Sequence, residues 1–171
     1  NVVLVRENGK RFYDETKGDY EYFATAMAWS GDPDRLNGGG PIWAIFDQDA
    51  VERTGWNVEP PYVDKDAGYF FQADTLEELA AQVIKNKYQW RPMPGENLVE
   101  TIQKFNSYVD AGQDPEFKRP MAGAFKVARP PFYAAWATPV HHDSLTGLRI
   151  NTKAQVMDIF GNVIPGLYAG G

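Results

Sequence analysis

Apolar residues in the middle of the chain recur every third or fourth position, which is the spacing of an α-helix. Residues 74–88 and 95–110 both show this pattern. Thr75, followed three residues later by Glu78, forms a capping box that predicts the start of the first helix, and Gly112 predicts the end of the second. The expected buried faces are Leu76, Leu79, Ala80, Val83 and Ile84 in the first helix and Leu98, Ile102, Phe105 and Val109 in the second.

Short runs of apolar and β-branched residues near both ends of the chain predict strands. The runs are residues 2–6, 11–14, 41–47, 69–73 and 130–140, followed by the segments LRINT, AQVMD and LYA. Asn8-Gly9 predicts a hairpin turn between the first two runs, because both residues tolerate positive φ. Asp47 is expected to begin a short helix ending at Thr54, and residues 19–29 carry a further helical stripe. Helices in the middle and strands at both ends predict an α+β fold.

Composition narrows the class of protein. Of the 171 residues, 43% are hydrophobic and 14% are aromatic, which is enough for a packed core. The net charge of −6 argues against nucleic acid as a partner, because phosphates favour a basic surface. No basic cluster or long apolar run indicates a membrane partner. The absence of Cys excludes disulfides, thiolate metal sites and a Cys nucleophile within these residues.

The segment VHHDSLTG, residues 140–147, contains the strongest candidates for ligand-binding or catalytic side chains. His141 and His142 stand among small and polar residues between two predicted strands. The segment is therefore either a ligand site or an exposed loop with solvated imidazoles. A metal site is disfavoured, because adjacent side chains in an extended chain point in opposite directions and the chain has no third His.

Tyr133 and a charged group near the N-terminus are further candidates. Tyr133, in PPFYAAW, either transfers a proton or packs in the core. Arg11, Asp14 and Glu15 follow the predicted hairpin turn and form either a charged edge or part of a site. The three glycines of LNGGGP lack the strand-before, helix-after frame of a dinucleotide-binding motif, so this segment is expected to be a loop.

Three segments of the chain, taken in order, resemble one family. They are GKRFYDE at residues 9–15, PPFYAAWATPVHHDSLTGLRINTKAQVMD at residues 130–158, and GNVIPGLYAGG at residues 161–171. Together they resemble the flavoproteins that include soluble fumarate reductases, 3-ketosteroid dehydrogenases and urocanate reductase. The similarity is dense over residues 130–171, whereas residues 16–129 match mainly in the layout of their helices.

The resemblance implies an architecture in which a capping, substrate-binding domain interrupts an FAD-binding domain. Residues 1–129 would form the capping domain, and residues 130–171 would return to the FAD-binding domain as a small β segment. The Gly-x-Gly-x-x-Gly unit that binds the ADP part of FAD does not occur here. We therefore expect a fragment that does not hold FAD by itself and whose partner is the remainder of its own FAD-binding domain. The residues expected to be exposed on the face toward that partner are Val163, Ile164, Leu167 and Tyr168.

The resemblance also assigns site residues. The second His of the family's loop binds a substrate carboxylate, and this role falls on His142, with Tyr133 or His142 as the catalytic proton-transfer group. The substrate-binding residues implied are His141, His142, Ser144 and Thr146. The cofactor-binding residues implied are Gly147, Leu148, Ala169, Gly170 and Gly171.

Two departures from the family pattern bear on the substrate. The family's HHTMGG loop is replaced by HHDSLTG, one residue longer, and Asp143 would repel a dicarboxylate. The Arg of a family T-T-R-D segment, which is the proton donor in fumarate reducers, has no counterpart between Lys17 and Asp19. We therefore expect hydride transfer between FAD and an activated C=C bond of a small enone or enoate rather than fumarate. The alternative is a stand-alone, non-enzymatic ligand- or protein-binding domain.

Overall fold

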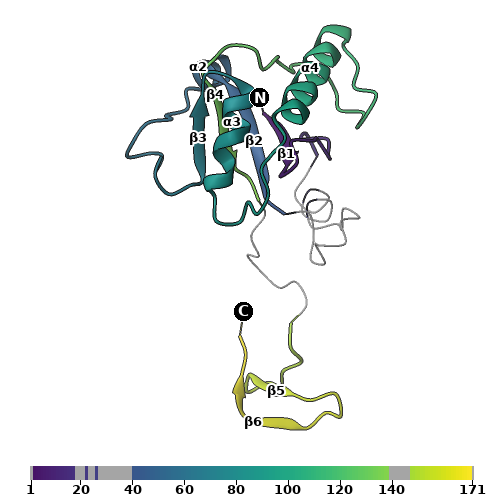
Figure 1. Ribbon diagram of the computed structural model, residues 1–171. Helices are drawn as coiled ribbons and strands as arrows, with labels where there is room; N and C mark the ends of the chain where they lie inside the picture. Colours follow the sequence, from purple (N-terminus) through teal and green to yellow (C-terminus); the bar gives the residue numbers. More distant parts are fainter. Residues whose placement is uncertain (1, 18–21, 23–25, 27–39, 139–146, 171) are drawn as a thin grey trace. The chain divides into compact units, whose positions relative to one another are not determined.

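Figure 1 shows a computed structural model of the chain, which describes residues 2–17, 22, 26, 40–138 and 147–170. The chain divides into two compact units, Asn1–Pro139 and Val140–Gly171. Within the described ranges, every α-helix belongs to the first unit, and the second unit contains strands and turns. The prediction of a mixed helix-and-sheet fold is therefore confirmed.

The first unit is built on a four-stranded antiparallel sheet. Its strands are β1 (Val3–Arg6), β2 (Ile42–Asp47), β3 (Phe70–Ala73) and β4 (Phe132–Trp136), in the order β1-β2-β4-β3. The last of these four strands in the sequence, β4, thus lies between β2 and β3 (Figure 1). The strand predictions for residues 41–47 and 69–73 are confirmed. The compact unit ends after β4, so β4 completes the sheet of the first unit.

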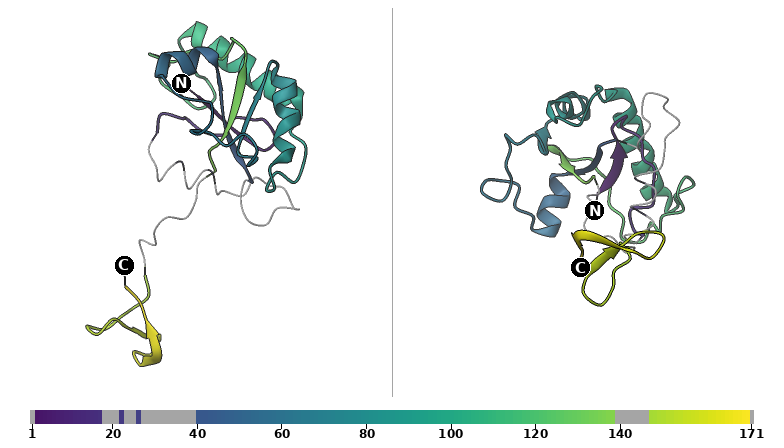
Figure 2. Two further views of the ribbon diagram at one scale, coloured as in Figure 1. Left: turned by 90° about the vertical axis from the view of Figure 1, so that its left-hand side faces the viewer. Right: turned by 90° about the horizontal axis from the view of Figure 1, so that it is seen from below.

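Helices cover both faces of this sheet. The helices α3 (Leu76–Gln82) and α4 (Gly95–Ala111) cover one face, where Trp43, Leu79, Leu98 and Phe105 belong to the main core (Figure 2). The short helix α2 (Gln48–Thr54) lies at the end of β2 and contributes to a second, smaller core on the opposite face. Among the described residues, no helix has the length and apolar character needed to cross a lipid bilayer.

Local signals begin and end these helices as predicted. The side chain of Asp47 accepts a hydrogen bond from the Ala50 amide at 3.0 Å and caps α2. The Thr75 hydroxyl accepts from the Glu78 amide at 3.2 Å and caps α3. Gly112 has a φ of 67° and ends α4 in the left-handed conformation that glycine adopts without strain.

The predicted helix over residues 74–88 is too long. The α-helix ends at Gln82 and a 3₁₀ turn, η1 (Val83–Lys85), follows. A 3₁₀ turn rotates each residue further around the axis than an α-helix does. Ile84 consequently leaves the buried face and is 40% exposed, whereas Val83 stays buried.

The predicted hairpin of residues 2–6 with residues 11–14 is wrong in its second strand. The Asn8-Gly9 turn forms, with Gly9 at a φ of 77° and the Arg6 amide donating to the Lys10 carbonyl at 3.0 Å. Only a single bridge, between Val5 and Arg11, continues the pairing, and β1 pairs with β2 instead. The turn docks on α4, because a Cβ on Gly9 would lie 3.0 Å from the Leu98 nitrogen.

The second unit is a two-stranded antiparallel sheet of β5 (Gln155–Met157) and β6 (Val163–Tyr168). Asp158 holds the turn between them, because its carboxylate accepts from the amides of Phe160 and Asn162 at 2.9 and 2.8 Å. The segment LRINT forms only an isolated bridge, between Ile150 and Val156, so the strand predicted there is wrong. The prediction of exposed apolar residues along β6 is confirmed for Val163, Ile164, Leu167 and Tyr168.

The helix predicted over residues 19–29 lies mostly outside the described residues. Tyr22 and Ala26 are described there, and both are helical. The LNGGGP loop prediction lies outside the described residues apart from Gly40 and Pro41.

Candidate functional site

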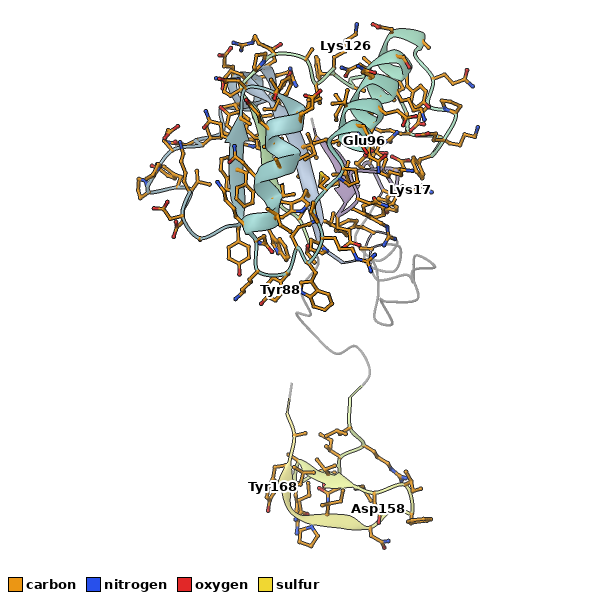
Figure 3. The ribbon with its side chains drawn as sticks, viewed as in Figure 1. Lys17, Tyr88, Glu96, Lys126, Asp158 and Tyr168 are labelled. Carbon is orange, nitrogen blue, oxygen red and sulfur yellow. The ribbon has the colours of Figure 1, made fainter. Side chains whose placement is uncertain are left out.

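The structure describes only part of the predicted site. His141, His142, Ser144, Thr146 and Gly171 lie outside the described residues, so their predicted roles stay predictions. Tyr133 belongs to the sheet of the first unit, and Gly147, Leu148, Ala169 and Gly170 belong to the second unit. Figure 3 shows the described side chains of both units.

Tyr133 is a buried residue of β4. Its ring stacks on Phe46 with centroids 5.2 Å apart and lies 5.7 Å from the ring of Phe70. Its hydroxyl donates to the Gln48 side-chain oxygen at 2.7 Å. Burial is the main cause that raises the pKa of this phenol. Tyr133 thus packs in the smaller core and has a polar partner on α2, so a proton-transfer role requires the bond to Gln48 to open.

Tyr22 connects the end of β4 with the N-terminal motif, which is the segment GKRFYDE at residues 9–15. The Tyr22 hydroxyl donates to the carbonyl oxygen of Ala137, immediately beyond β4. Its ring lies 5.8 Å from the ring of Tyr13 and 6.4 Å from that of Phe12, both within the segment GKRFYDE. Burial raises the pKa of Tyr22 to about 12. Two segments that resemble the flavoprotein family, far apart in sequence, are therefore brought together here.

A cluster of aromatic rings surrounds Trp136, the last residue of β4. The rings of Tyr69 and Tyr88 have centroids 5.5 and 5.7 Å from that of Trp136, and the buried Trp43 lies 5.5 Å away on another side. The Lys87 ammonium lies 4.9 Å from the centroid of the Tyr88 ring. We call Tyr69, Lys87, Tyr88 and Trp136 the Trp136 cluster.

The sequence did not identify the Trp136 cluster, because its members come from three segments that only the sheet topology brings together. The one signal available was the density of aromatic and basic residues in KNKYQWR, residues 85–91.

The side chains of Arg11 and Glu15 are buried, and Asp14 is buried as well, so these three residues are not the charged edge of a turn. The Arg11 guanidinium donates to both oxygens of Glu15 at 2.9 Å and to Asp114 at 3.0 Å. Arg119 donates to Glu15 at 2.8 Å. Both guanidinium groups lie over the Phe105 ring, with centroid distances of 5.2 and 5.1 Å. This network joins the N-terminal motif to the segment after α4, and sequence analysis missed Asp114 and Arg119.

The described residues of the second unit include four of the predicted cofactor contacts, and two of these have open backbone. Positions Gly147 and Gly170 have no atom within 4 Å of where a Cβ would lie, so their backbone is open to a ligand. Leu148 is 61% exposed. The Ala169 amide already donates a hydrogen bond to the Ala154 carbonyl at 3.0 Å. Residues 147–170 form no helix N-terminus and no Gly-x-Gly-x-x-Gly turn that could hold the pyrophosphate. These residues offer open backbone and an apolar strand, so the phosphates of FAD would have to be bound by other parts of a protein.

Comparison with known proteins decides the family. A sequence profile of the family "FAD binding domain" matches residues 1–171. The chain belongs to this family. The resemblance stated from the sequence is therefore confirmed.

The relatives are oxidoreductases. The chain is 38% identical over 173 residues to the NADH:acrylate oxidoreductase of Vibrio harveyi, covering 100% of the chain and 15% of that protein. It is 32% identical over 171 residues to a fumarate reductase (cytochrome) of Shewanella frigidimarina, covering 99% and 26%. It is 27% identical over 194 residues to the 3-oxosteroid 1-dehydrogenase of Mycobacterium tuberculosis, covering 99% and 32%. The chain thus spans less than a third of each of these relatives.

Two solved structures have a similar fold. The open conformation of a flavocytochrome c3 fumarate reductase matches with a TM-score of 0.60 and 25% identity, over 100% of this chain and 27% of that one. The 3-ketosteroid delta1-dehydrogenase of Sterolibacterium denitrificans, in complex with 1,4-androstadiene-3,17-dione, matches with a TM-score of 0.65 and 25% identity, over 98% and 32%.

Proposed function

We propose that these residues are part of an FAD-dependent oxidoreductase that acts on CH–CH bonds, reducing or forming a C=C bond conjugated to a carbonyl or carboxylate. The observation that carries the proposal is the match of residues 1–171 to the FAD binding domain family, together with relatives named for acrylate, fumarate and 3-oxosteroid chemistry. FAD, when bound, supplies the centre that exchanges hydride with the substrate. The protein has to bind the substrate, orient it and move a proton.

Within this proposal, residues 1–129 are the capping domain and residues 130–171 lead back to the FAD-binding domain. Because β4 is an inner strand of the first unit's sheet, the part that would belong to the FAD-binding domain is the second unit, Val140–Gly171. The exposed apolar face of β6 supports the second assignment, because apolar strands left open in this way are typical of surfaces that another part of a protein covers. FAD would contact Gly147, Leu148, Ala169, Gly170 and Gly171, and the open backbone at Gly147 and Gly170 supports this assignment. The remainder of the site would come from sequence outside these residues.

His142 is the residue that we propose to bind the substrate's carboxylate or carbonyl, with His141, Ser144 and Thr146 beside it. An imidazole can donate a hydrogen bond to a carbonyl oxygen and titrates near neutral pH. Tyr133 is the second proton-transfer candidate. We propose a small enone or enoate rather than fumarate, since Asp143 disfavours a second carboxylate and residues 17–19 lack the donor Arg.

Substitution of His142 tests this assignment in the full-length protein. We expect His142→Ala to lower kcat/KM for acrylate about 100-fold, because a positioned acid or hydrogen-bond donor contributes about that factor. The flavin content should stay unchanged. His141→Ala is the matched comparison, and its effect should be smaller, because the resemblance gives the carboxylate-binding role to the second His of the segment. Unaltered kinetics for His142→Ala would remove His142 from the site.

A further inference from the structure

The strand β3 lies at one edge of the first unit's sheet, with β4 on its other side (Figure 1). The Trp136 amide donates to the Tyr69 carbonyl at 2.9 Å, and these two residues lie opposite each other when the β3–β4 register is continued. Antiparallel pairs alternate between hydrogen-bonded and non-hydrogen-bonded positions. The backbone of Phe71 therefore bonds to β4, whereas the backbone groups of Phe70 and Gln72 face the open edge.

One side-chain hydrogen bond agrees with this alternation. The Gln82 side-chain amide donates to the Gln72 carbonyl at 2.9 Å, as expected for a carbonyl that faces away from β4. Within the described part of the chain, the amide and carbonyl of Phe70 and the amide of Gln72 have no hydrogen-bond partner. A strand edge with free backbone groups of this kind can pair with an added strand.

A hollow of about 340 Å³ lies along this edge, within the size range of ligand sites. Residues of β3 line it together with Gln82 and Lys85. The loop before β3 forms another wall. The Asn86 side chain donates to the Gly68 carbonyl at 2.7 Å, and a Cβ on Gly68 would lie only 3.4 Å from the Lys85 carbonyl oxygen. The loop is therefore held against η1, so the fold itself fixes the shape of the hollow.

Lys85 gives the hollow a charge preference. Lys65 also lines the hollow but pairs with Glu59 at 2.7 Å. Lys85 forms no ion pair with any residue that the structure describes. Asp66 lines the hollow on the side of the loop, whereas Lys85 belongs to η1. An extended segment in the hollow therefore gains from an acidic side chain on the η1 side, beside Lys85.

We propose that the open edge of β3 binds an extended peptide segment of another protein, which adds a strand to the sheet and presents an acidic side chain to Lys85. The free backbone groups of Phe70 and Gln72 supply hydrogen bonds to the peptide main chain, and Lys85 supplies selectivity. The remainder of this protein is assigned to the face of β6, in the second unit. A second copy fits less well, because Gln82 already occupies the Gln72 carbonyl in each copy.

Selection from a library of random heptapeptides against the full-length protein tests the inference without assuming a partner sequence. We expect the selected peptides to alternate β-branched with polar residues and to share an Asp or Glu. Lys85→Glu should weaken the binding of a selected peptide about fivefold or more, because repulsion replaces an exposed ion pair. Lys87→Glu makes the same charge change at a residue that does not line the hollow and should leave the dissociation constant unchanged.

A proline at position 72 tests the backbone hydrogen bonds. Proline lacks the N–H group and is tolerated on edge strands where that group faces outward, so Gln72→Pro should keep the sheet. The affinity for the selected peptide should fall about tenfold, because a peptide carbonyl loses its donor. Gln72→Ala removes the same side chain but keeps the N–H group, and it should bind as the wild type does. Thermal unfolding checks that Gln72→Pro is folded; if it is not, Lys85→Glu and amide exchange decide.

Amide hydrogen exchange, measured residue by residue in the full-length protein, separates the possible occupants. Without peptide, the Phe70 and Gln72 amides should exchange fast and the Phe71 amide slowly, and the selected peptide should protect Phe70 and Gln72. Protection without peptide would show that the protein's own chain covers the edge, or a second copy if it appears only at high protein concentration. Either result would overturn the inference. So would a library that yields no binding peptide, or equal binding by folded Gln72→Pro and Gln72→Ala.

Discussion

The packing of three segments in the first unit depends on one buried carboxylate, that of Glu15. Its carboxylate accepts hydrogen bonds from Arg11, from Arg119 and, at 3.2 Å, from the Leu4 amide. The side chain is 3% exposed. One carboxylate therefore joins β1, the N-terminal motif and the segment after α4. Removing one member of this network leaves the other members charged and buried. The loss of any one of them is therefore expected to destabilise the fold.

We expect Glu15→Gln to lower the free energy of unfolding by about 3 kcal/mol or more, because two buried guanidinium groups lose a counter-charge. Urea denaturation of the two proteins measures the difference. The control is Glu100→Gln, which removes a carboxylate paired with Lys104 at 2.6 Å on the exposed surface of α4 and should cause no measurable change. Equal destabilisation by the two substitutions would contradict the structural role of the buried network.

Residue-level prediction succeeded where the cause was local. The capping residues Asp47 and Thr75 and the turn residue Gly9 were recognisable because their partners lie within a few positions. The burial of Arg11 and Glu15 could not be read from the sequence, since Asp114 and Arg119 lie more than 100 positions away. The Trp136 cluster was missed for the same reason.

At the scale of elements, Asp47 connects the sheet to its smaller helix and to a distant loop. One carboxylate oxygen caps α2, and the other accepts from the amides of Ala128 and Arg129 at 2.8 and 3.0 Å. The residue is 1% exposed. It thereby fixes α2 and the approach to β4 at the same end of the sheet, next to the Tyr133–Gln48 pair.

Asp47→Ala should therefore cost about 3 kcal/mol of unfolding free energy, combining a lost helix cap with two backbone amides left without their acceptor. Thr75→Ala removes a single capping bond on the exposed end of α3 and should cost about 1 kcal/mol. Thermal or urea unfolding of both variants gives the comparison. A smaller loss for Asp47→Ala than for Thr75→Ala would show that Asp47 acts as an ordinary cap.

The elements themselves were predicted well from periodicity, and their limits less well. The long amphipathic helix α4 and the strand β2 match the predicted ranges closely, because their patterns are strong and their ends carry clear signals. The pairing partner of β1 and the early end of α3 depend on tertiary packing. Neither the 3₁₀ turn nor the choice of β2 over residues 11–14 has a signal within the local sequence.

At the scale of the whole chain, the fold follows from where β4 is placed. Residues 132–136 cross from the C-terminal part of the sequence into the centre of the first sheet, between β2 and β3. Sequence periodicity predicts that this segment is extended but carries no information on strand order. The resemblance to flavoproteins, by contrast, depended on short motifs and was sufficient to predict the family.

The central claim is that these residues belong to a flavin enzyme that exchanges hydride with a C=C bond, and one anaerobic experiment tests it most directly. The full-length protein is purified, its visible absorption spectrum is recorded, the flavin is reduced chemically, and acrylate or cinnamate is then added without oxygen. We predict a bound flavin whose oxidised spectrum returns when the enoate is added. A colourless protein, or a reduced flavin that neither compound reoxidises, would contradict the account.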